Sequence, residues 1–314
     1  MYRDLTTAVV IPAYNEELLI RRTVEGIPAF VDYIVVVNDA STDGTLSKLS
    51  EIASDHHNLT IISNEVNLGI GGALKAGYNY LLENSTANAV AIVAGDDQFD
   101  SADLQPMLDE LIDQHLDYVK ACRFYDLEAL KAMPRYRRFG NVLISLLTKF
   151  STGYYSVTDI TDGCGWLRRS TLEKVNFKLI RNRYDYETSL LTALSIAGAR
   201  VKDFAVSAYY GEETSTIDVL PTALRNLWAV WVGFWQRIYY KYVLYSFHPI
   251  ALLLFGGLVA SFIGVGFSVL ILVEKIVQGL SPSTGTVMLA VLPLVLGIQF
   301  LLTALIMDAS NEGK

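Results

Sequence analysis

Residues 89–100 read Ala-Val-Ala-Ile-Val-Ala-Gly-Asp-Asp-Gln-Phe-Asp, and the rest of the chain is organised around this stretch. Its apolar, β-prone first half predicts a buried strand, and residues 103–114 after it have a helical pattern. Acidic side chains at the carboxyl end of such a strand lie where open α/β sheets bind ligands. Carboxylate and carboxamide oxygens suit a hard divalent cation, Mg²⁺ or Mn²⁺. The alternative is an acidic turn that caps the next helix.

Apolar β-branched runs alternate with helical patterns through the first 125 residues. Such alternation predicts an α/β fold with a mostly parallel, Rossmann-like sheet covered by helices on both faces. The predicted strands are 8–12, 33–38, 59–63, 89–95 and 118–123, and the predicted helices are 16–26, 45–54, 72–83 and 103–114.

Composition excludes several classes of protein. The net charge of −8 over 314 residues leaves no overall basic footprint for nucleic acid. Two cysteines, Cys122 and Cys164, are too few for a disulfide framework or a cysteine-based metal site, and they fit a reducing compartment. The first residues lack the apolar core of a signal peptide, so we expect the first domain in the cytosol.

Two apolar runs, 250–273 and 287–307, each exceed the roughly 20 residues that a helix needs to cross a bilayer. We interpret them as a transmembrane hairpin; helices buried in a soluble core are the alternative. Lys and Arg are concentrated before the first run, at Arg225, Arg237 and Lys241, whereas the loop between the runs offers Lys275. The positive-inside rule therefore predicts an integral membrane protein with its large domain and both termini in the cytoplasm.

Two further segments carry patterns of helices that lie in a membrane interface. Residues 135–138, Arg-Tyr-Arg-Arg, precede the apolar run 142–147. Residues 217–245 have one apolar stripe opposite a polar face; the stripe holds Leu224, Leu227, Trp228, Trp231, Trp235, Ile238 and Tyr242, and the polar face Arg225, Gln236, Arg237 and Lys241. Protein core is the alternative for this stripe. The expected organisation is a cytosolic domain 1–215 that includes an interfacial helix near 136–152, a juxtamembrane amphipathic helix 216–246 and a hairpin 247–314.

Three polar turns follow predicted strands and meet at the same sheet edge. They read Pro-Ala-Tyr-Asn-Glu-Glu at 12–17, Asn-Asp-Ala-Ser-Thr-Asp-Gly-Thr at 38–45, and Asn-Leu-Gly-Ile-Gly-Gly at 67–72, which brings Asn67 to the crevice. A crevice lined in this way can read a base and a ribose and can receive phosphate near helix starts. The glycine run lacks the spacing of a Walker loop or a dinucleotide fingerprint.

With these motifs in order, residues 7–215 resemble the family-two inverting glycosyltransferases of GT-A fold. The branch they resemble is that of the polyprenyl-phosphate glycosyltransferases, such as dolichyl-phosphate mannose synthase. The resemblance implies that the nucleotide is held by Pro12, Tyr14, Glu16 and Asp39. The Asp-x-Asp-x-Gln signature of the family falls on 94–98, which implies Asp96 and Gln98 as metal ligands. Ala94 replaces the first Asp, and Asp97 is the candidate to substitute for it.

The acceptor side shows the same resemblance. Residues 119–124 are similar to the family's Val-x-Gly-Ser-Arg-Tyr strand, which implies that Arg123, with Arg138 on the next helix, holds a lipid phosphate. A basic patch that touches anionic headgroups is the alternative for residues 135–138. Asp159 falls in a loop similar to Asp-x-Thr-Ser-Gly-Phe-Arg and is a transfer-site candidate; the alternative is an Asx turn. The family's cationic diphosphate clamp is absent from 208–215, so Arg181 or Arg183 is the candidate replacement.

The predicted activity is transfer of one sugar, with inversion, from a UDP- or GDP-sugar to a polyprenyl or dolichyl phosphate. Asp96, Asp97 and Asp159 are the candidate catalytic residues. The phosphate acceptor is already an oxyanion near neutral pH, so it needs positioning more than a base. One alternative is transfer to a lipid or glycan hydroxyl; another is a non-catalytic, membrane-anchored scaffold that binds nucleotide sugar. The sequence leaves the sugar and the oligomeric state open, a homo-oligomer included.

Overall fold

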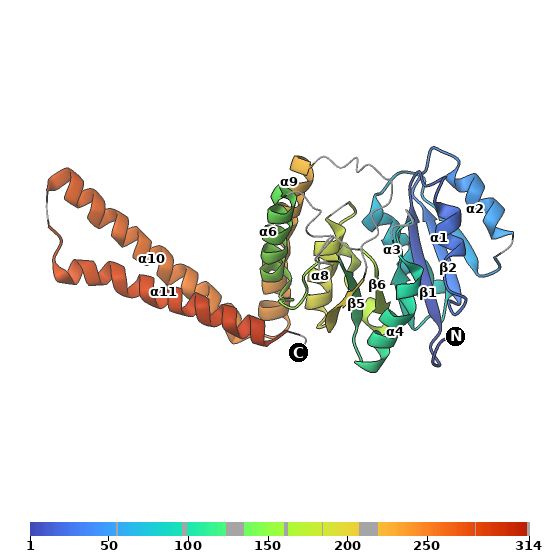
Figure 1. Cartoon of the computed structure of the whole chain (residues 1–314). Coiled ribbons are helices and arrows are strands. Elements are labelled where there is room, and N and C mark those ends of the chain that lie inside the picture. Colours follow the sequence, from blue (N-terminus) through green and yellow to red (C-terminus); the bar gives the residue numbers. More distant parts are fainter. Residues whose placement is uncertain are drawn as a thin grey trace. The chain divides into compact units, whose positions relative to one another are not determined.

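The computed structural model describes residues 1–54, 56–95, 99–123, 135–159, 163–183, 185–206, 219–279 and 281–312 (Figure 1). Side chains are not described at 135–139, 141 and 219–223. The chain forms two compact units, Met1–Arg237 and Ile238–Glu312.

The first unit is built on one seven-stranded sheet of order β3-β2-β1-β4-β6-β5-β7. Its neighbouring strands pair in parallel except around β6, which is antiparallel to β4 and β5. The predicted mostly parallel sheet is therefore confirmed. The strands are β1 (Thr7–Ala13), β2 (Tyr33–Asn38), β3 (Leu59–Ser63), β4 (Ala89–Ile92), β5 (Tyr118–Cys122), β6 (Gly165–Arg168) and β7 (Val201–Ala205).

Helices cover both faces of the sheet, and each face has its own apolar core. On one face, alternate side chains such as Val10 and Val37 pack with α3 (Ile70–Asn84) and α8 (Tyr186–Ile196). On the other, Val9 and Ile11 pack with α1 (Ile20–Glu25), α2 (Thr45–Ala53) and α4 (Leu104–Asp113). This alternation is what the period of two residues along a strand dictates. The short elements are η1 (Ser101–Asp103), α7 (Arg169–Leu172) and η3 (Phe177–Leu179).

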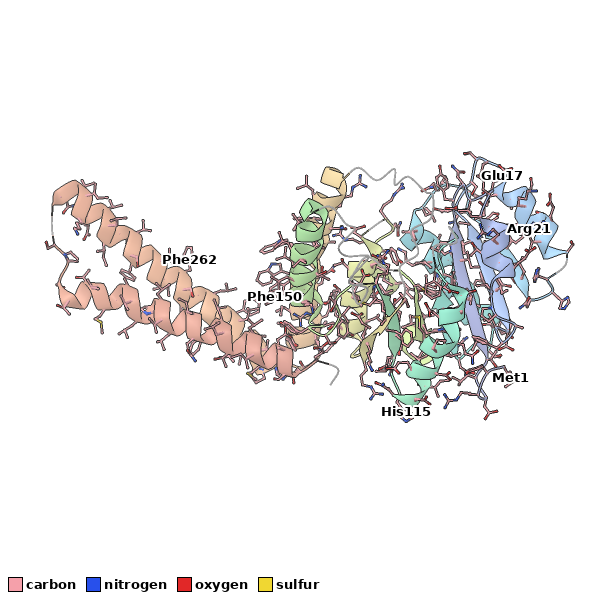
Figure 2. All side chains as sticks on the ribbon, viewed as in Figure 1. Met1, Glu17, Arg21, His115, Phe150 and Phe262 are labelled. Atoms are coloured by element: carbon pink, nitrogen blue, oxygen red, sulfur yellow. The ribbon has the colours of Figure 1, made fainter. Side chains whose placement is uncertain are left out.

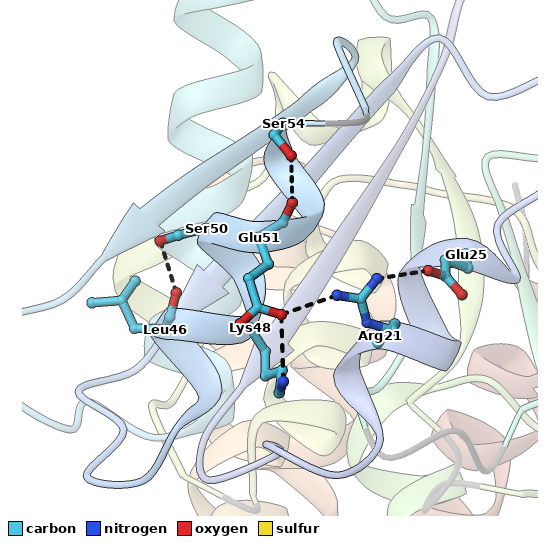
Figure 3. Close-up of polar contacts among 7 residues, drawn as sticks. All are labelled: Arg21, Glu25, Leu46, Lys48, Ser50, Glu51 and Ser54. Atoms are coloured by element: carbon cyan, nitrogen blue, oxygen red, sulfur yellow. Dashed lines mark hydrogen bonds and ion pairs between the residues drawn. The ribbon is translucent and has the colours of Figure 1, made fainter.

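A surface network joins α1 to α2 (Figure 3). Arg21 pairs with Glu25 at 3.1 Å and with Glu51 at 3.2 Å, and Lys48 reaches Glu51 at 3.3 Å. These side chains are two-fifths or more exposed, so each pair contributes little to the free energy of unfolding. The buried cores hold these helices on the sheet.

Helices α6 (Arg135–Thr152) and α9 (Val219–Arg237) lie side by side and pack with α8 (Figure 1). Arg237 ends α9 and is wholly buried: its guanidinium donates to the backbone oxygens of Ser151 (2.7 Å) and Phe150 (2.8 Å). It therefore satisfies carbonyl groups that the end of α6 would otherwise leave unpaired. The expectation that Arg237 belongs to a solvated polar face is wrong, because these carbonyls compete successfully for its five donors.

The amphipathic helix predicted over 217–245 is two elements, α9 and a π-helical segment η4 (Ile238–Leu244). In the described part of α9, Leu224, Leu227, Trp228 and Trp231 are exposed, as a surface stripe requires, whereas Ile238 and Tyr242 of η4 are buried. The residues of the predicted stripe are therefore exposed in the described part of α9 and buried at these two positions of η4.

The second unit contains two long apolar helices, α10 (Pro249–Gln278) and α11 (Thr284–Ser310), which pack against each other as a hairpin. Both are long and apolar enough to cross a membrane, and each is longer than the predicted span. Most of their exposed side chains are apolar; Phe262, labelled in Figure 2, is 82% exposed. The buried positions between them are small residues such as Gly257, Gly264 and Ala290, as in helices packed within lipid.

Candidate functional site

A cavity of about 310 Å³ opens at the carboxyl ends of β1, β2 and β4. All five residues predicted to bind nucleotide line it: Pro12, Tyr14, Glu16, Asp39 and Asn67. Arg183 lines it as well, together with Ala13, Gly69, Ile70, Ala73, Ala94 and Gly95. Turns far apart in sequence thus meet at one sheet edge because parallel strands end there together.

The turn after β1 is held by the turn after β2. The Asn15 amide nitrogen donates to Ser41 Oγ (3.0 Å), and Asn15 Oδ1 accepts from the Thr42 amide (2.8 Å). Asn15 and Ala40 both have positive φ, 59° and 58°. Asn tolerates this left-handed conformation, whereas in Ala40 it brings Cβ close to the following carbonyl oxygen. The backbone beside the cavity is therefore locally strained at Ala40.

Asp39 is a buried residue that organises the start of the glycine run. Its Oδ1 accepts from Asn64 Nδ2 (2.7 Å) and the Leu68 amide (2.9 Å), and its Oδ2 accepts from the Gly69 amide (2.7 Å). Its predicted contact with the nucleotide stays a prediction; the structure adds that the same carboxylate binds the backbone of Leu68 and of Gly69, which lines the cavity.

The glycine run binds a second stretch of the chain. The amides of Gly71 and Gly72 donate to the Asn182 carbonyl, at 2.9 and 3.3 Å. A Cβ at Gly71 would lie 2.1 Å from the Arg181 carbonyl oxygen, and one at Gly69 would lie 2.6 Å from that of Asn182. These two amides are therefore already hydrogen-bonded, and the expectation that the crevice receives phosphate near a helix start stays a prediction. The glycines let residues 181–183 lie directly on α3.

With residues 181–183 packed on α3, the two candidate arginines for the diphosphate clamp lie in different places. Arg183 lines the cavity and its Nη1 donates to Asn67 Oδ1 at 3.2 Å. Arg181 Nη1 pairs with Asp185 at 3.1 Å, and Arg181 is not among the cavity residues. Lys75 of α3 also binds residues 180–182: its Nζ donates to the carbonyl of Ile180 (3.0 Å) and to the side chain of Asn182.

Replacing Arg183 by Ala is expected to raise the KM for nucleotide sugar about tenfold, because a guanidinium beside a diphosphate contributes a charge-assisted hydrogen bond. Arg181→Ala, the matched control two residues away, is expected to stay within about twofold of wild type. Initial-rate measurements against donor concentration check both. Equal effects of the two substitutions would contradict the assignment of Arg183.

The acceptor-side candidates Arg123 and Asp159 contact each other. Asp159 is buried, and its Oδ2 accepts from the Arg123 amide (3.1 Å) and from Arg123 Nε (3.2 Å). Burial alone would raise the pKa of Asp159, but the charges of Lys120 and Arg123 outweigh it and lower the pKa. Asp159 is thus a carboxylate at neutral pH that orients a partly exposed guanidinium. Arg138 belongs to α6, and its side chain lies outside the described residues.

The predicted metal ligands Asp96 and Gln98, with Asp97, also lie outside the described residues. Ala94 and Gly95, which precede them, line the cavity. Across the described ranges, no group of three His, Cys, Asp or Glu side chains could hold a metal. A carboxylate and a carboxamide form a donor set that suits Mg²⁺ or Mn²⁺, so the residues present fit such an ion. The alternative interpretation of this acidic stretch is a turn that caps the next helix. Within the described residues, Asp100 has that role: its Oδ1 accepts from the Ala102 amide (2.9 Å).

Comparison with known proteins identifies the family of the chain. A family model described as glycosyl transferase family 2 matches residues 8–175, more than half of the chain. The chain belongs to glycosyl transferase family 2. It is a glycosyltransferase, and its resemblance to that family is confirmed.

Two archaeal relatives match much of this glycosyltransferase. A UDP-N-acetylglucosamine–dolichyl-phosphate N-acetylglucosaminyltransferase of Methanococcus voltae is 29% identical over 195 residues, covering 58% of this chain and 77% of that protein. An uncharacterised protein of Methanocaldococcus jannaschii is 28% identical over 204 residues, covering 65% and 82%.

Solved structures of glucosyl-3-phosphoglycerate synthase from Mycobacterium tuberculosis share the fold. The complex with Mn²⁺, UDP and glucosyl-3-phosphoglycerate has a TM-score of 0.53 at 19% identity and covers 74% of this chain and 80% of that chain. The complex with Mg²⁺ and UDP has a TM-score of 0.55 at 18% identity and covers 73% and 79%. The predicted GT-A fold of this glycosyltransferase is thereby confirmed.

Proposed function

We propose that this glycosyltransferase moves one sugar from a UDP- or GDP-sugar to the phosphate of a polyprenyl lipid, with inversion. The observation that carries the proposal is that Arg123 and α6 belong to one hydrogen-bonded assembly. Asp159 holds Arg123, and Ser145 Oγ on α6 donates to the carbonyl of the neighbouring Thr158 at 2.9 Å. A cation suited to phosphate is thus tied to a helix whose exposed face is apolar.

That apolar face supports a lipid as the source of the phosphate. Val142, Leu143 and Leu146 of α6 are exposed, as are Trp228 and Trp231 of the adjacent α9. Apolar and Trp side chains on neighbouring helices are typical of a surface that enters the headgroup region of a membrane. The hairpin α10–α11 would span that membrane, with Arg225 and Lys241 before it on the cytoplasmic side.

In the proposed reaction the acceptor phosphate oxygen attacks the anomeric carbon as the bond to the nucleotide diphosphate breaks. Because the second pKa of a phosphate monoester is about 6, the nucleophile is already ionised and no strong base is required. Arg123 and Arg138 would orient it, while Arg183 would bind the diphosphate. A divalent ion at Asp96 and Gln98, with Asp97 as a further carboxylate, would supply positive charge beside the departing diphosphate.

The test uses the full chain in lipid nanodiscs with radiolabelled UDP- and GDP-sugars, beginning with UDP-N-acetylglucosamine because of the M. voltae relative's name. Label is expected in the lipid extract with polyprenyl phosphate and not with the matched polyprenol, which lacks the ionised oxygen. Labelled polyprenol would support transfer to a hydroxyl instead. Metal-dependent nucleotide binding without turnover would support a scaffold.

A further inference from the structure

A buried lysine lies beneath the proposed acceptor site. Lys120 on β5 is 1% exposed, and its Nζ donates to the Asp159 carbonyl and to the Ala121 carbonyl (3.3 Å). Lysine is rarely buried without a compensating charge, because removing an ammonium from water is costly. The neighbouring carboxylates are Asp159 and, on β7, Asp203.

The segment that carries Asp159 is held from three elements. Lys120 of β5 binds the Asp159 carbonyl, and Asp203 Oδ2 of β7 accepts from the Thr158 amide at 2.6 Å. Ser145 of α6 binds the carbonyl of the same Thr158. These contacts fix the Asp159 carboxylate where it accepts from the amide and Nε of Arg123.

The cluster contains two cationic side chains, Lys120 and Arg123, and two carboxyl groups, Asp159 and Asp203. Arg123 and Asp159 form a pair of zero net charge, so an incoming phosphate would meet little attraction from that pair alone. Among the described charged side chains, Lys120 and Asp203 complete the cluster. Burial and the charge of Asp159 raise the pKa of Asp203, whereas Lys120 opposes the rise. The charge of Lys120 lowers the pKa of both carboxyl groups and so favours their ionised forms.

We propose that Lys120 is a positioning residue for the acceptor: its buried side chain holds the backbone of Asp159 in place, so that the Asp159 carboxylate aims Arg123 at the acceptor phosphate. The inference rests on the proposed function and goes beyond it, since Lys120 acts through Asp159 and Arg123 and not on the substrate. A lysine within the apolar strand 118–122 is the only signal in the sequence for this role.

The first test is Lys120→Met, which keeps most of the unbranched side chain and removes its charged group. The KM for polyprenyl phosphate is expected to rise about tenfold, with the KM for the donor unchanged as evidence of an intact fold. The pKa of Asp159 should rise, so the acid limb of kcat/KM for the acceptor should move to higher pH. Lys202→Met, the control, removes an exposed lysine of β7 that pairs with Glu110 and should move neither quantity beyond twofold.

The second test adds Asp203→Asn to Lys120→Met. The Asn side-chain oxygen can still accept from Thr158, while repulsion between Asp203 and Asp159 is removed, so the acceptor KM should recover about threefold. An unchanged acceptor KM in Lys120→Met, or no recovery in the double variant, would overturn the inference. A wild-type chain that labels no lipid phosphate would overturn the proposed function itself, which is a separate result.

Discussion

Asp96→Asn is expected to lower kcat for sugar transfer by about a thousandfold or more, the largest effect of any substitution proposed for this chain. The change removes one carboxylate charge from the predicted ion-binding set, where a carboxamide is a weaker ligand for Mg²⁺ or Mn²⁺. The measurement is kcat across a titration of Mn²⁺ and of Mg²⁺. Calorimetry in the absence of added metal should show that the variant still binds nucleotide. Retained binding would indicate that the cavity is intact.

Asp100→Asn is the matched control for that substitution. Asp100 lies in the same acidic stretch but caps η1 through the Ala102 amide, and Asn caps a helix about as well as Asp. Its kcat should remain within about twofold of wild type. Wild-type kcat and metal dependence in Asp96→Asn would refute the assignment of Asp96.

Gly71→Ala is expected to weaken donor binding, although Gly71 is not itself a predicted ligand. The added Cβ would meet the Arg181 carbonyl oxygen at 2.1 Å and Tyr186 Cβ at 2.6 Å, so residues 181–183 would have to move off α3. That movement would take Arg183 from the cavity wall. We expect a loss of about 2–3 kcal/mol of stability and a donor KM at least tenfold higher. Thermal unfolding and donor kinetics measure the two effects.

Gly140→Ala serves as the control, because a Cβ at Gly140 in α6 meets no described atom within 4 Å. Alanine also has the higher helix propensity, so the stability of this variant should equal or exceed that of wild type. A donor KM for Gly71→Ala equal to that of Gly140→Ala would mean that residues 181–183 do not need the glycine run.

The first five strands could be predicted because each is a short, mostly apolar run, and each of the first four is followed by a turn and a helix, which are local signals. β6 and β7 were missed for a physical reason. Gly165–Arg168 has only four residues, and Val201–Ala205 carries Lys202 and Asp203, so neither shows the apolar pattern of a buried strand. Their place in the sheet comes from pairing with β5, a contact between distant parts of the chain.

The candidate site, too, could be predicted from the sequence only in part. Pro12, Tyr14, Glu16, Asp39 and Asn67 could be named from their turns, and they line one cavity. Their contacts with a nucleotide stay predictions. The choice between Arg181 and Arg183, and the role proposed for Lys120, could not be made from spacing, because both depend on which backbone lies against which.

The amino-acid sequence by itself determined the family, the parallel sheet and the two apolar helices, since strand period, helix period and the length of an apolar run are properties of adjacent residues. Only the tertiary structure decided that the glycine run receives residues 181–183 and that Arg237 caps α6. It also decided that Asp159 lies between Lys120 and Arg123. Each of these depends on desolvated groups finding partners 36 to 111 residues away, and such pairings are set by packing rather than by local pattern.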